Sequence, residues 1–270
     1  MTVRLPSPIG KDISDHWVQI EESPRRVRVA FGGETIADSK HALLLREAGC
    51  LPVYYFPQRD VRMERLRATE RRNRCPYKGE AAYFTVVAGD RVAELGAWNY
   101  THPPLQCAEL KDYVSFEWSQ MDAWYEEDEE IFVHPRDPYK RVDVLQSSRH
   151  VRVLVGGEEV ANTRRPRLLF ETNHPPRYYI PPEDVRTELV IPSSTITRCP
   201  YKGVASYWSV RIGERIFPDL VWSYLDPIPE CPKVRGFLCF FQERAPEIYV
   251  DGERVPVPKT KWSRSDAEHL

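Results

Sequence analysis

The chain has 270 residues and a mass of 31.5 kDa, with 41% hydrophobic and 29% charged residues. This composition fits a globular protein of one or two domains. Its 38 basic and 40 acidic residues give a formal net charge of −2. No overall basic excess therefore attracts nucleic acid or an anionic membrane, and we expect neither as a partner. The 24 prolines favour strands and turns over long helices.

The N-terminal sequence lacks the apolar segment of a secretory signal and the arginine-rich pattern of a transit peptide. There is no apolar run of about 18 residues, so we expect a cytoplasmic protein with no membrane span. Six cysteines are too few for a disulfide scaffold, and they show no CxxC spacing. The sequence therefore predicts no bound metal and no cofactor.

Taken in chain order, the first elements predict short strands. Apolar and polar residues alternate over residues 28–31, and Gly32-Gly33 then predicts a hairpin turn. Residues 60–72 favour a helical turn. Residues 81–87 are rich in aromatic and β-branched types, as strands are, and a second hairpin is expected at Gly89. Short strands separated by frequent turns predict a barrel or sandwich.

The strongest feature is an internal repeat with an offset of 124 residues, which continues without a gap for more than 80 residues. The identical pairs include Gly32 and Gly156, Glu47 and Glu171, Asp60 and Asp184, Arg62 and Arg186, Trp98 and Trp222, Tyr100 and Tyr224, and Cys107 and Cys231. A period of this length is that of a whole domain. We therefore predict two tandem copies of one mainly β domain, at 14–136 and 137–262. The chain from Lys259 is polar and expected to be mobile, and residues 263–270 form a C-terminal tail.

The segment Cys-Pro-Tyr-Lys-Gly is identical in both copies, at residues 75–79 and 199–203. Proline favours an extended preceding cysteine, and Pro-Tyr-Lys-Gly suits a β-turn at a strand entrance. Lys78 and Lys202 could there reach an anionic group, or simply be solvated. Cys75 and Cys199 could be reactive thiols, but no histidine is shared at matching positions. This favours small buried cysteines.

The other shared residues are of types that form either a core with salt bridges or a pocket with aromatic walls and a few polar side chains that hold a ligand. Tyrosine and tryptophan keep a polar group where an apolar core would use leucine, and we take this as favouring a pocket in each copy. The candidate ligand-binding residues are Glu47, Tyr54, Arg62, Lys78, Tyr83, Trp98 and Tyr100 in the first copy, and Glu171, Tyr178, Arg186, Lys202, Tyr207, Trp222 and Tyr224 in the second.

The CPYKG motif and its surroundings resemble the domain-of-unknown-function family 427. The second copy, residues 197–208, follows the family pattern T-x-C-P-Y-K-G-x-A-x-Y-W, and the first copy has Asn73 for threonine and Phe84 for tryptophan. The resemblance implies a small β-barrel similar to the β-tent class. Many β-tent proteins hold zinc with two CxxC pairs, which this chain lacks. The family also has a nucleotidyltransferase-like label, but no close carboxylate pair for Mg²⁺ is shared by both copies.

Our leading hypothesis is that each copy binds a small molecule in an aromatic-lined pocket, with Lys78 and Lys202 suited to an anionic one. An enzyme that uses the cysteine or lysine of CPYKG is the first alternative. An interaction module that only docks partners is the second. The sequence contains no P-loop, no GxGxxG and no GxSxG motif to decide among them.

Overall fold

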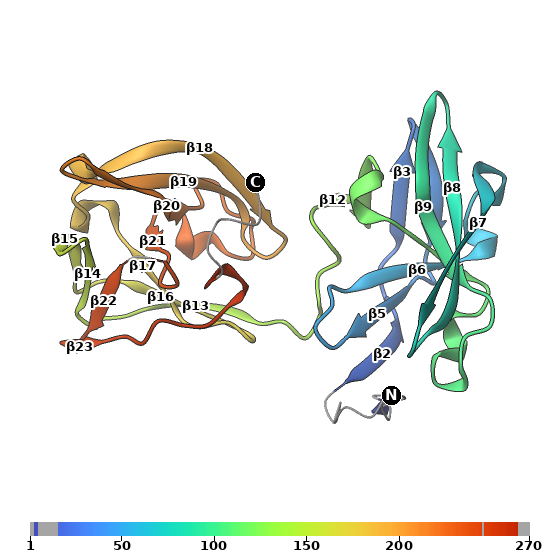
Figure 1. The fold of residues 1–270 in the computed structure, drawn as a ribbon, viewed down its shortest axis with the longest axis horizontal. Coiled ribbons are helices and arrows are strands. Elements are labelled where there is room, and N and C mark those ends of the chain that lie inside the picture. Colours follow the sequence, from blue (N-terminus) through green and yellow to red (C-terminus); the bar gives the residue numbers. More distant parts are fainter. Residues whose placement is uncertain (1–2, 5–15, 245, 264–270) are drawn as a thin grey trace. The chain divides into compact units, whose positions relative to one another are not determined.

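The structure is a computed structural model that describes residues 3–4, 16–244 and 246–263. The predicted tail, 263–270, lies outside the described residues except for Ser263, as do residues 14–15. The chain divides into two compact units between Asp137 and Pro138. Both units consist of strands joined by turns and short 3₁₀ helices (Figure 1), so the prediction of two mainly β copies is confirmed.

The first unit contains a larger and a smaller antiparallel sheet. In spatial order the larger sheet consists of β1 (Val3–Arg4), β2 (Trp17–Glu22), β5 (Leu43–Glu47), β6 (Val53–Pro57), β10 (Tyr113–Phe116), β9 (Arg91–Tyr100), β8 (Gly79–Ala88) and β7 (Leu66–Cys75). The smaller sheet consists of β12 (Glu129–Ile131), β11 (Ala123–Glu126), β3 (Val27–Phe31) and β4 (Glu34–Ser39).

The second unit repeats this arrangement. Its larger sheet consists of β13 (Val142–Gln146), β16 (Arg167–Glu171), β17 (Arg177–Ile180), β21 (Leu238–Phe240), β20 (Arg215–Ser223), β19 (Gly203–Ile212) and β18 (Val190–Cys199). Its smaller sheet consists of β15 (Glu158–Thr163), β14 (Val151–Val155), β22 (Glu247–Val250) and β23 (Glu253–Arg254). Within the described residues every sheet ends in two edge strands, so each unit is a pair of open sheets and not a closed barrel.

The central strands of the larger sheet of the first unit, β5, β6 and β10, are buried on both faces. Successive residues of a strand point to opposite faces, and adjacent tyrosines of β6 follow this rule. Tyr54 belongs to the cluster that includes residues of the smaller sheet, whereas Tyr55 belongs to a second cluster with Cys107 and Leu110. That second cluster is completed by the 3₁₀ helix η3 (Leu105–Leu110).

Both predicted hairpins are present, because β3 pairs with β4 across Gly32-Gly33 and β8 pairs with β9 across Gly89. The helical turn expected in residues 60–72 is present as a short 3₁₀ turn, and the segment from Leu66 onward is a strand. The 3₁₀ helices η1 (Gln58–Asp60) and η2 (Met63–Arg65) precede β7, whose pairing with β8 outweighs the local helical preference. The other 3₁₀ helices are η4 (Trp118–Gln120), η5 (Pro182–Asp184), η6 (Thr187–Leu189), η7 (Pro232–Val234) and η8 (Lys261–Ser263).

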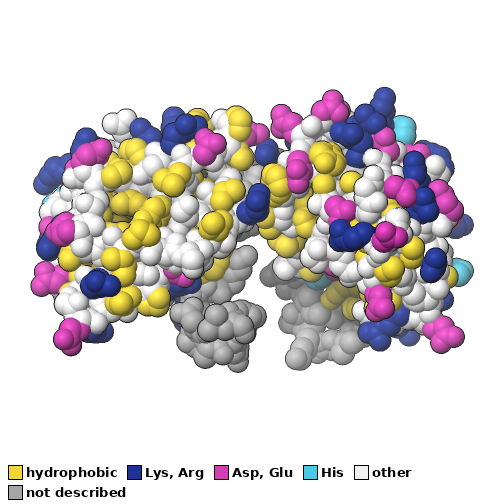
Figure 2. Space-filling view, turned by 90° about the horizontal axis from the view of Figure 1, so that it is seen from above, with side chains coloured by type: hydrophobic (Ala, Val, Ile, Leu, Met, Phe, Trp, Pro, Cys, Tyr) yellow, Lys and Arg dark blue, Asp and Glu magenta, His cyan; other side chains and the backbone are white. Residues whose placement is uncertain are grey.

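Figure 2 shows acidic and basic side chains mixed with hydrophobic ones over the face in view, as the balanced net charge leads one to expect. The hydrophobic side chains exposed on the second unit include Ile196 and Val204 of β18 and β19. In the part of the chain that the structure describes, no helix has the length and apolar character needed to cross a membrane.

Candidate functional site

The CPYKG motif forms the turn between β7 and β8 in the first unit and between β18 and β19 in the second. Its glycines have φ values of +91° at Gly79 and +107° at Gly203, a backbone conformation that favours glycine. A Cβ on Gly79 would lie 3.0 Å from the carbonyl oxygen of His102, and one on Gly203 would lie 3.2 Å from the backbone nitrogen of Ile228. The loop after β9 in the first unit, and the loop after β20 in the second, therefore pack directly against these turns.

The lysine of the motif is buried in an ion pair in both units. Lys78 contacts the carboxylate of Glu47, which ends β5, and both residues are less than 10% exposed. In the second unit, Lys202 Nζ lies 2.6 Å from Glu171 Oε2 at the end of β16. The anionic group that each lysine reaches is thus a side chain of the same unit.

A second basic residue completes each cluster. His16 Nε2 lies 3.1 Å from the Glu47 carboxylate, and its ring stacks on the tyrosine of the first CPYKG motif with centroids 3.7 Å apart. Lys140 Nζ lies 2.8 Å from the Glu171 carboxylate and 4.9 Å from the ring centre of Tyr201. Positions 16 and 140 also differ by 124, but they hold different residues, so a search for identical pairs missed them. A search for pairs of similar charge would have found them.

The two lysines of the second unit control the charge of Glu171. Burial alone would raise the pKa of this carboxyl, but Lys202 and Lys140 outweigh burial and lower the pKa to about 2. Burial acts to lower the pKa of Lys202, yet Cys199 and Glu171 outweigh it and the pKa is raised. The carboxyl of Glu171 is therefore ionised and the amine of Lys202 protonated at neutral pH.

This arrangement predicts a loss of stability in acid. Because the folded-state pKa of Glu171 lies below its usual 4.5, the stabilisation is complete above pH 4.5 and is lost as the pH falls toward 2. The shift corresponds to about 3 kcal/mol of unfolding free energy. Urea unfolding measured between pH 7 and pH 2.5 should show the unfolding free energy of the native chain falling as the pH falls. The slope of unfolding free energy against pH should be smaller in Glu171→Gln. Identical slopes in the two proteins would contradict the assignment.

Cysteines surround the same turns, and all six described cysteines are free thiols. Cys75 and Cys199 are half-buried, whereas burial raises the pKa of both Cys107 and Cys231 to about 11. The Cys107 sulfur lies 3.6 Å from the Tyr77 carbonyl oxygen. A thiol with a raised pKa is a poor nucleophile at neutral pH, so Cys107 and Cys231 act as packing residues.

The shared tryptophans and tyrosines have the same geometry in both units. Trp98 Nε1 donates a hydrogen bond to the Tyr55 hydroxyl at 3.1 Å, and Trp222 donates one to Tyr179 at 3.2 Å. The two rings of each pair are nearly perpendicular, at 90° and 88°. Tyr83 lies beside Trp98, with ring centroids 6.5 Å apart. These aromatic residues share one face of the larger sheet with the Glu–Lys pair.

Four of the expected site residues lie elsewhere. The Tyr54 hydroxyl, on the opposite face, donates to Glu126 at 2.8 Å, and Tyr178 has the equivalent position in β17. Arg62 pairs with Glu34 at 2.7 Å on the surface. Its counterpart Arg186 is likewise exposed and forms surface ion pairs. The neighbouring Asp60 and Asp184 each accept a hydrogen bond of 2.6 Å from Ser39 and Thr163, respectively.

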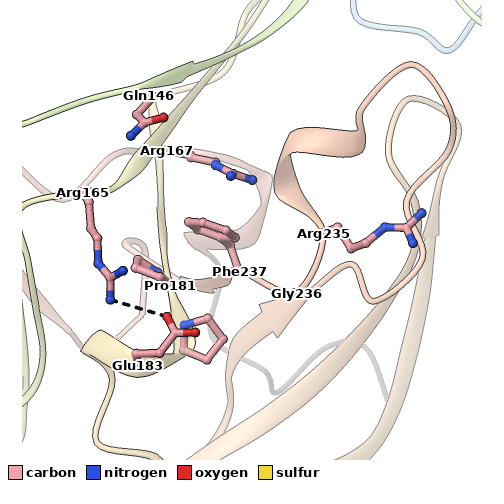
Figure 3. A pocket seen from close by; sticks show the side chains of 9 residues that line it. Gln146, Arg165, Arg167, Pro181, Glu183, Arg235, Gly236 and Phe237 are labelled. Atoms are coloured by element: carbon pink, nitrogen blue, oxygen red, sulfur yellow. Dashed lines mark ion pairs between the residues drawn. The ribbon is translucent and has the colours of Figure 1, made fainter.

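A cavity of about 440 Å³ lies in the second unit (Figure 3), and none of the expected site residues lines it. Its lining residues come from the ends of β13, β16 and β17 and from the loop before β21. They are Gln146, Arg165, Arg167, Pro181, Pro182, Glu183, Arg235, Gly236 and Phe237.

The three arginines of this cavity differ in their partners. Arg165 forms two hydrogen bonds of 3.0 Å with Asp184, and Figure 3 shows its ion pair with Glu183. Arg235 pairs with Asp226 at 3.0 Å, and its guanidinium extends away from the other labelled side chains. The guanidinium carbon of Arg167 lies 4.0 Å from the ring centre of Phe237 and the group donates to a backbone carbonyl. Among the described residues, Arg167 has no carboxylate partner.

The first unit lacks this chemistry. The residues at the positions equivalent to Arg165, Arg167 and Phe237 are His41, Leu43 and Tyr113. Leu43 is buried, so its position carries no charge. Comparing the copies for identity could not reveal a site that one copy alone contains. The basic pair at 165 and 167, absent from the first copy, was the available signal.

Comparison with protein families gives one match, in two segments. The model of a domain of unknown function, DUF427 (NTP_transf_9), matches residues 19–127 and 143–253. The two segments correspond to the two units and together cover more than half of the chain. None of the curated protein sequences compared with this chain matches it.

Proposed function

The chain belongs to the DUF427 family, with two tandem copies of the domain, and we propose that it binds a small anionic molecule in the arginine-lined cavity of the second unit. The observation that carries this proposal is Arg167, a cation at a cavity wall with no carboxylate beside it among the described residues. We therefore propose a ligand-binding pocket in the second unit alone, where the sequence led us to expect one in each copy.

The size and walls of the cavity support this function. Its volume of about 440 Å³ lies within the range of small-molecule sites, roughly 300–1,000 Å³. Phe237, Pro181 and Pro182 provide apolar surface, and Gln146 provides an amide. The Phe237 ring supports the flat face of the Arg167 guanidinium, which suits an arginine that binds a carboxylate or phosphate edge-on.

The CPYKG clusters support a structural role for the shared lysines. Lys78 and Lys202 are already paired with Glu47 and Glu171, and both lysines are largely buried. The raised pKa of Lys202 keeps its amine protonated at neutral pH, and a nucleophilic lysine needs the opposite shift. We therefore assign this pair to fixing the turn against the sheet rather than to an enzymatic step.

The test uses phenyl phosphate, which combines a dianion with a ring, and compares two arginine variants. Arg167→Leu introduces the residue found at the equivalent position of the first unit. The matched control is Arg215→Leu, because Arg215 also lies over a phenylalanine ring, at 5.1 Å from Phe217, but outside the cavity. Phenyl phosphate should raise the melting temperature of the native chain and of the control, but not of Arg167→Leu.

The expected stabilisation is about 2.7 kcal/mol when the ligand concentration is about 100 times its dissociation constant. Isothermal titration of the same proteins gives the constant directly. Equal stabilisation of Arg167→Leu and Arg215→Leu would show that Arg167 is not the anchor. If phenyl phosphate, inorganic phosphate and benzoate all fail to bind the native chain, the proposed function is wrong.

A further inference from the structure

The first unit has an arginine-rich strand at the edge of its larger sheet. β7 is the last strand in the order of that sheet, so among the residues that the structure describes one side of its backbone has no neighbouring strand. Four arginines lie on this strand of ten residues, and all four are exposed: Arg67, Arg71, Arg72 and Arg74. An edge of this kind is open to another extended chain.

These arginines lack carboxylate partners among the described residues, in contrast to their neighbours. Arg62 and Arg65 share Glu34, at 2.7 and 2.8 Å. The Arg72 guanidinium donates to carbonyl groups of its own strand. The acidic residues nearest in the strand pairing are Glu70, within β7, and Glu80, opposite Arg74. The edge therefore keeps an excess of positive charge.

The fold itself does not require this charge, because the second unit has the same strand without it. β18 has the same position at the edge, pairs with β19 in the same way, and carries a single arginine, Arg198. It also contains Pro192, a residue that prevents unwanted pairing at an edge. The two copies thus differ at this edge, where the first unit has several arginines without a carboxylate partner among the described residues.

The pairing register places the arginines on both faces of the sheet. Arg67 lies opposite Thr85, whereas Arg72 and Arg74 lie opposite Ala82 and Glu80. Side chains directly opposite each other share a face, and Thr85 and Ala82 point to opposite faces. A nucleic acid lying across one face would meet only part of this charge. A bulge between Ala68 and Arg72 divides the edge into two regular parts.

We propose that the β7 edge binds an extended acidic segment of a partner protein. Side chains of an extended segment alternate in direction, so its carboxylates can meet arginines on both faces. The balanced charge of the whole chain is consistent with a local basic surface of this kind, because attraction at short range does not need a net positive protein.

The test measures binding of a fluorescein-labelled ten-residue peptide made of repeated Thr-Glu-Glu to the full chain by fluorescence anisotropy at low salt. The variant carries Arg67→Gln, Arg71→Gln, Arg72→Gln and Arg74→Gln. A control with the same change in net charge carries Arg141→Gln, Arg149→Gln, Arg211→Gln and Arg254→Gln, all exposed in the second unit. The β7 variant should bind the peptide at least tenfold more weakly, while the control should bind as the native chain does.

Circular dichroism should show unchanged folding in both variants, because every altered side chain is exposed. Equal weakening in the two variants would overturn the proposal, since net charge alone would then explain the binding. Tighter binding of a ten-nucleotide oligothymidylate than of the peptide would identify a nucleic acid instead. Self-association that the β7 variant abolishes would identify the exposed acidic residues 127–130 of a second copy as the occupant. Either result would overturn the assignment to a partner protein.

Discussion

Replacing Glu171 by alanine should lower the unfolding free energy of the second unit by about 3–5 kcal/mol. Lys202 and Lys140 both lie within 3 Å of this carboxylate, at 2.6 and 2.8 Å, and Lys202 is buried. Removing the carboxylate leaves their ammonium groups without a counter-ion in a poorly hydrated site. The cost of that desolvation, rather than the loss of attraction in the pair, makes the effect large.

Urea unfolding followed by circular dichroism measures this change. The control is Glu183→Ala, which removes a glutamate that is 69% exposed and should cost less than about 1 kcal/mol. The double variant Glu171→Leu/Lys202→Met should recover part of the loss, because it removes both charges of the pair. If the unfolding free energy falls by less than about 1 kcal/mol in Glu171→Ala, water must hydrate the two lysine ammonium groups in place of the carboxylate. The structural role assigned to the pair would then be wrong.

The second large effect is expected at Glu243. Its side chain is 0% exposed and binds the guanidinium of Arg177 with contacts of 2.5 and 2.8 Å. The guanidinium carbon of Arg177 lies 5.6 Å from the ring centre of Trp222 and 5.8 Å from that of Trp262. Glu243→Ala would leave a buried cation beside two indole rings without its carboxylate, at a cost of about 3–5 kcal/mol.

Tryptophan fluorescence during unfolding can follow this change, because Trp222 and Trp262 lie beside Arg177. The apolar double variant Arg177→Met/Glu243→Leu should restore most of the stability. Thr260→Ala, which removes the 2.8 Å hydrogen bond to Glu243, should cost only about 1 kcal/mol. If Glu243→Ala and Thr260→Ala prove equally mild, Arg177 does not depend on its carboxylate partner.

The offset of 124 residues predicted two copies of one unit, and local patterns of alternation, glycine and proline predicted their strands and the turn at each CPYKG motif. It could not predict that Lys78 meets Glu47, because that contact depends on which strands are neighbours in the sheet. β5 and the turn after β7 are far apart in the chain, and short-range patterns contain no information on their distance.

Some of the site could have been resolved further from sequence alone. Tyr54 and Tyr55 are adjacent in a strand, so period-two alternation already implies that only one of them can face the glutamate. Arg62 was grouped with the site because it is identical in both copies, yet it lies between two 3₁₀ turns and pairs with Glu34 on the surface. A residue can be identical in both copies because the fold requires it or because a ligand does. Identity alone therefore does not identify a binding residue.

The polar C-terminal region from Lys259, which was expected to be mobile, contributes to the packing of the second unit. Thr260 bonds to Glu243, and Trp262 packs against the core. The last described part of the chain therefore completes the surroundings of Arg177.

This contact makes the surroundings of Arg177 depend on a segment that lies far along the chain from it. The first unit has Val53 where the second has Arg177, so it buries no arginine there and needs nothing from the later chain at that position. The second unit can enclose Arg177 fully only when the segment around Trp262 lies against it. Proteolytic removal of that segment would leave Glu243 without its hydrogen bond from Thr260 and Arg177 with one indole ring fewer beside it.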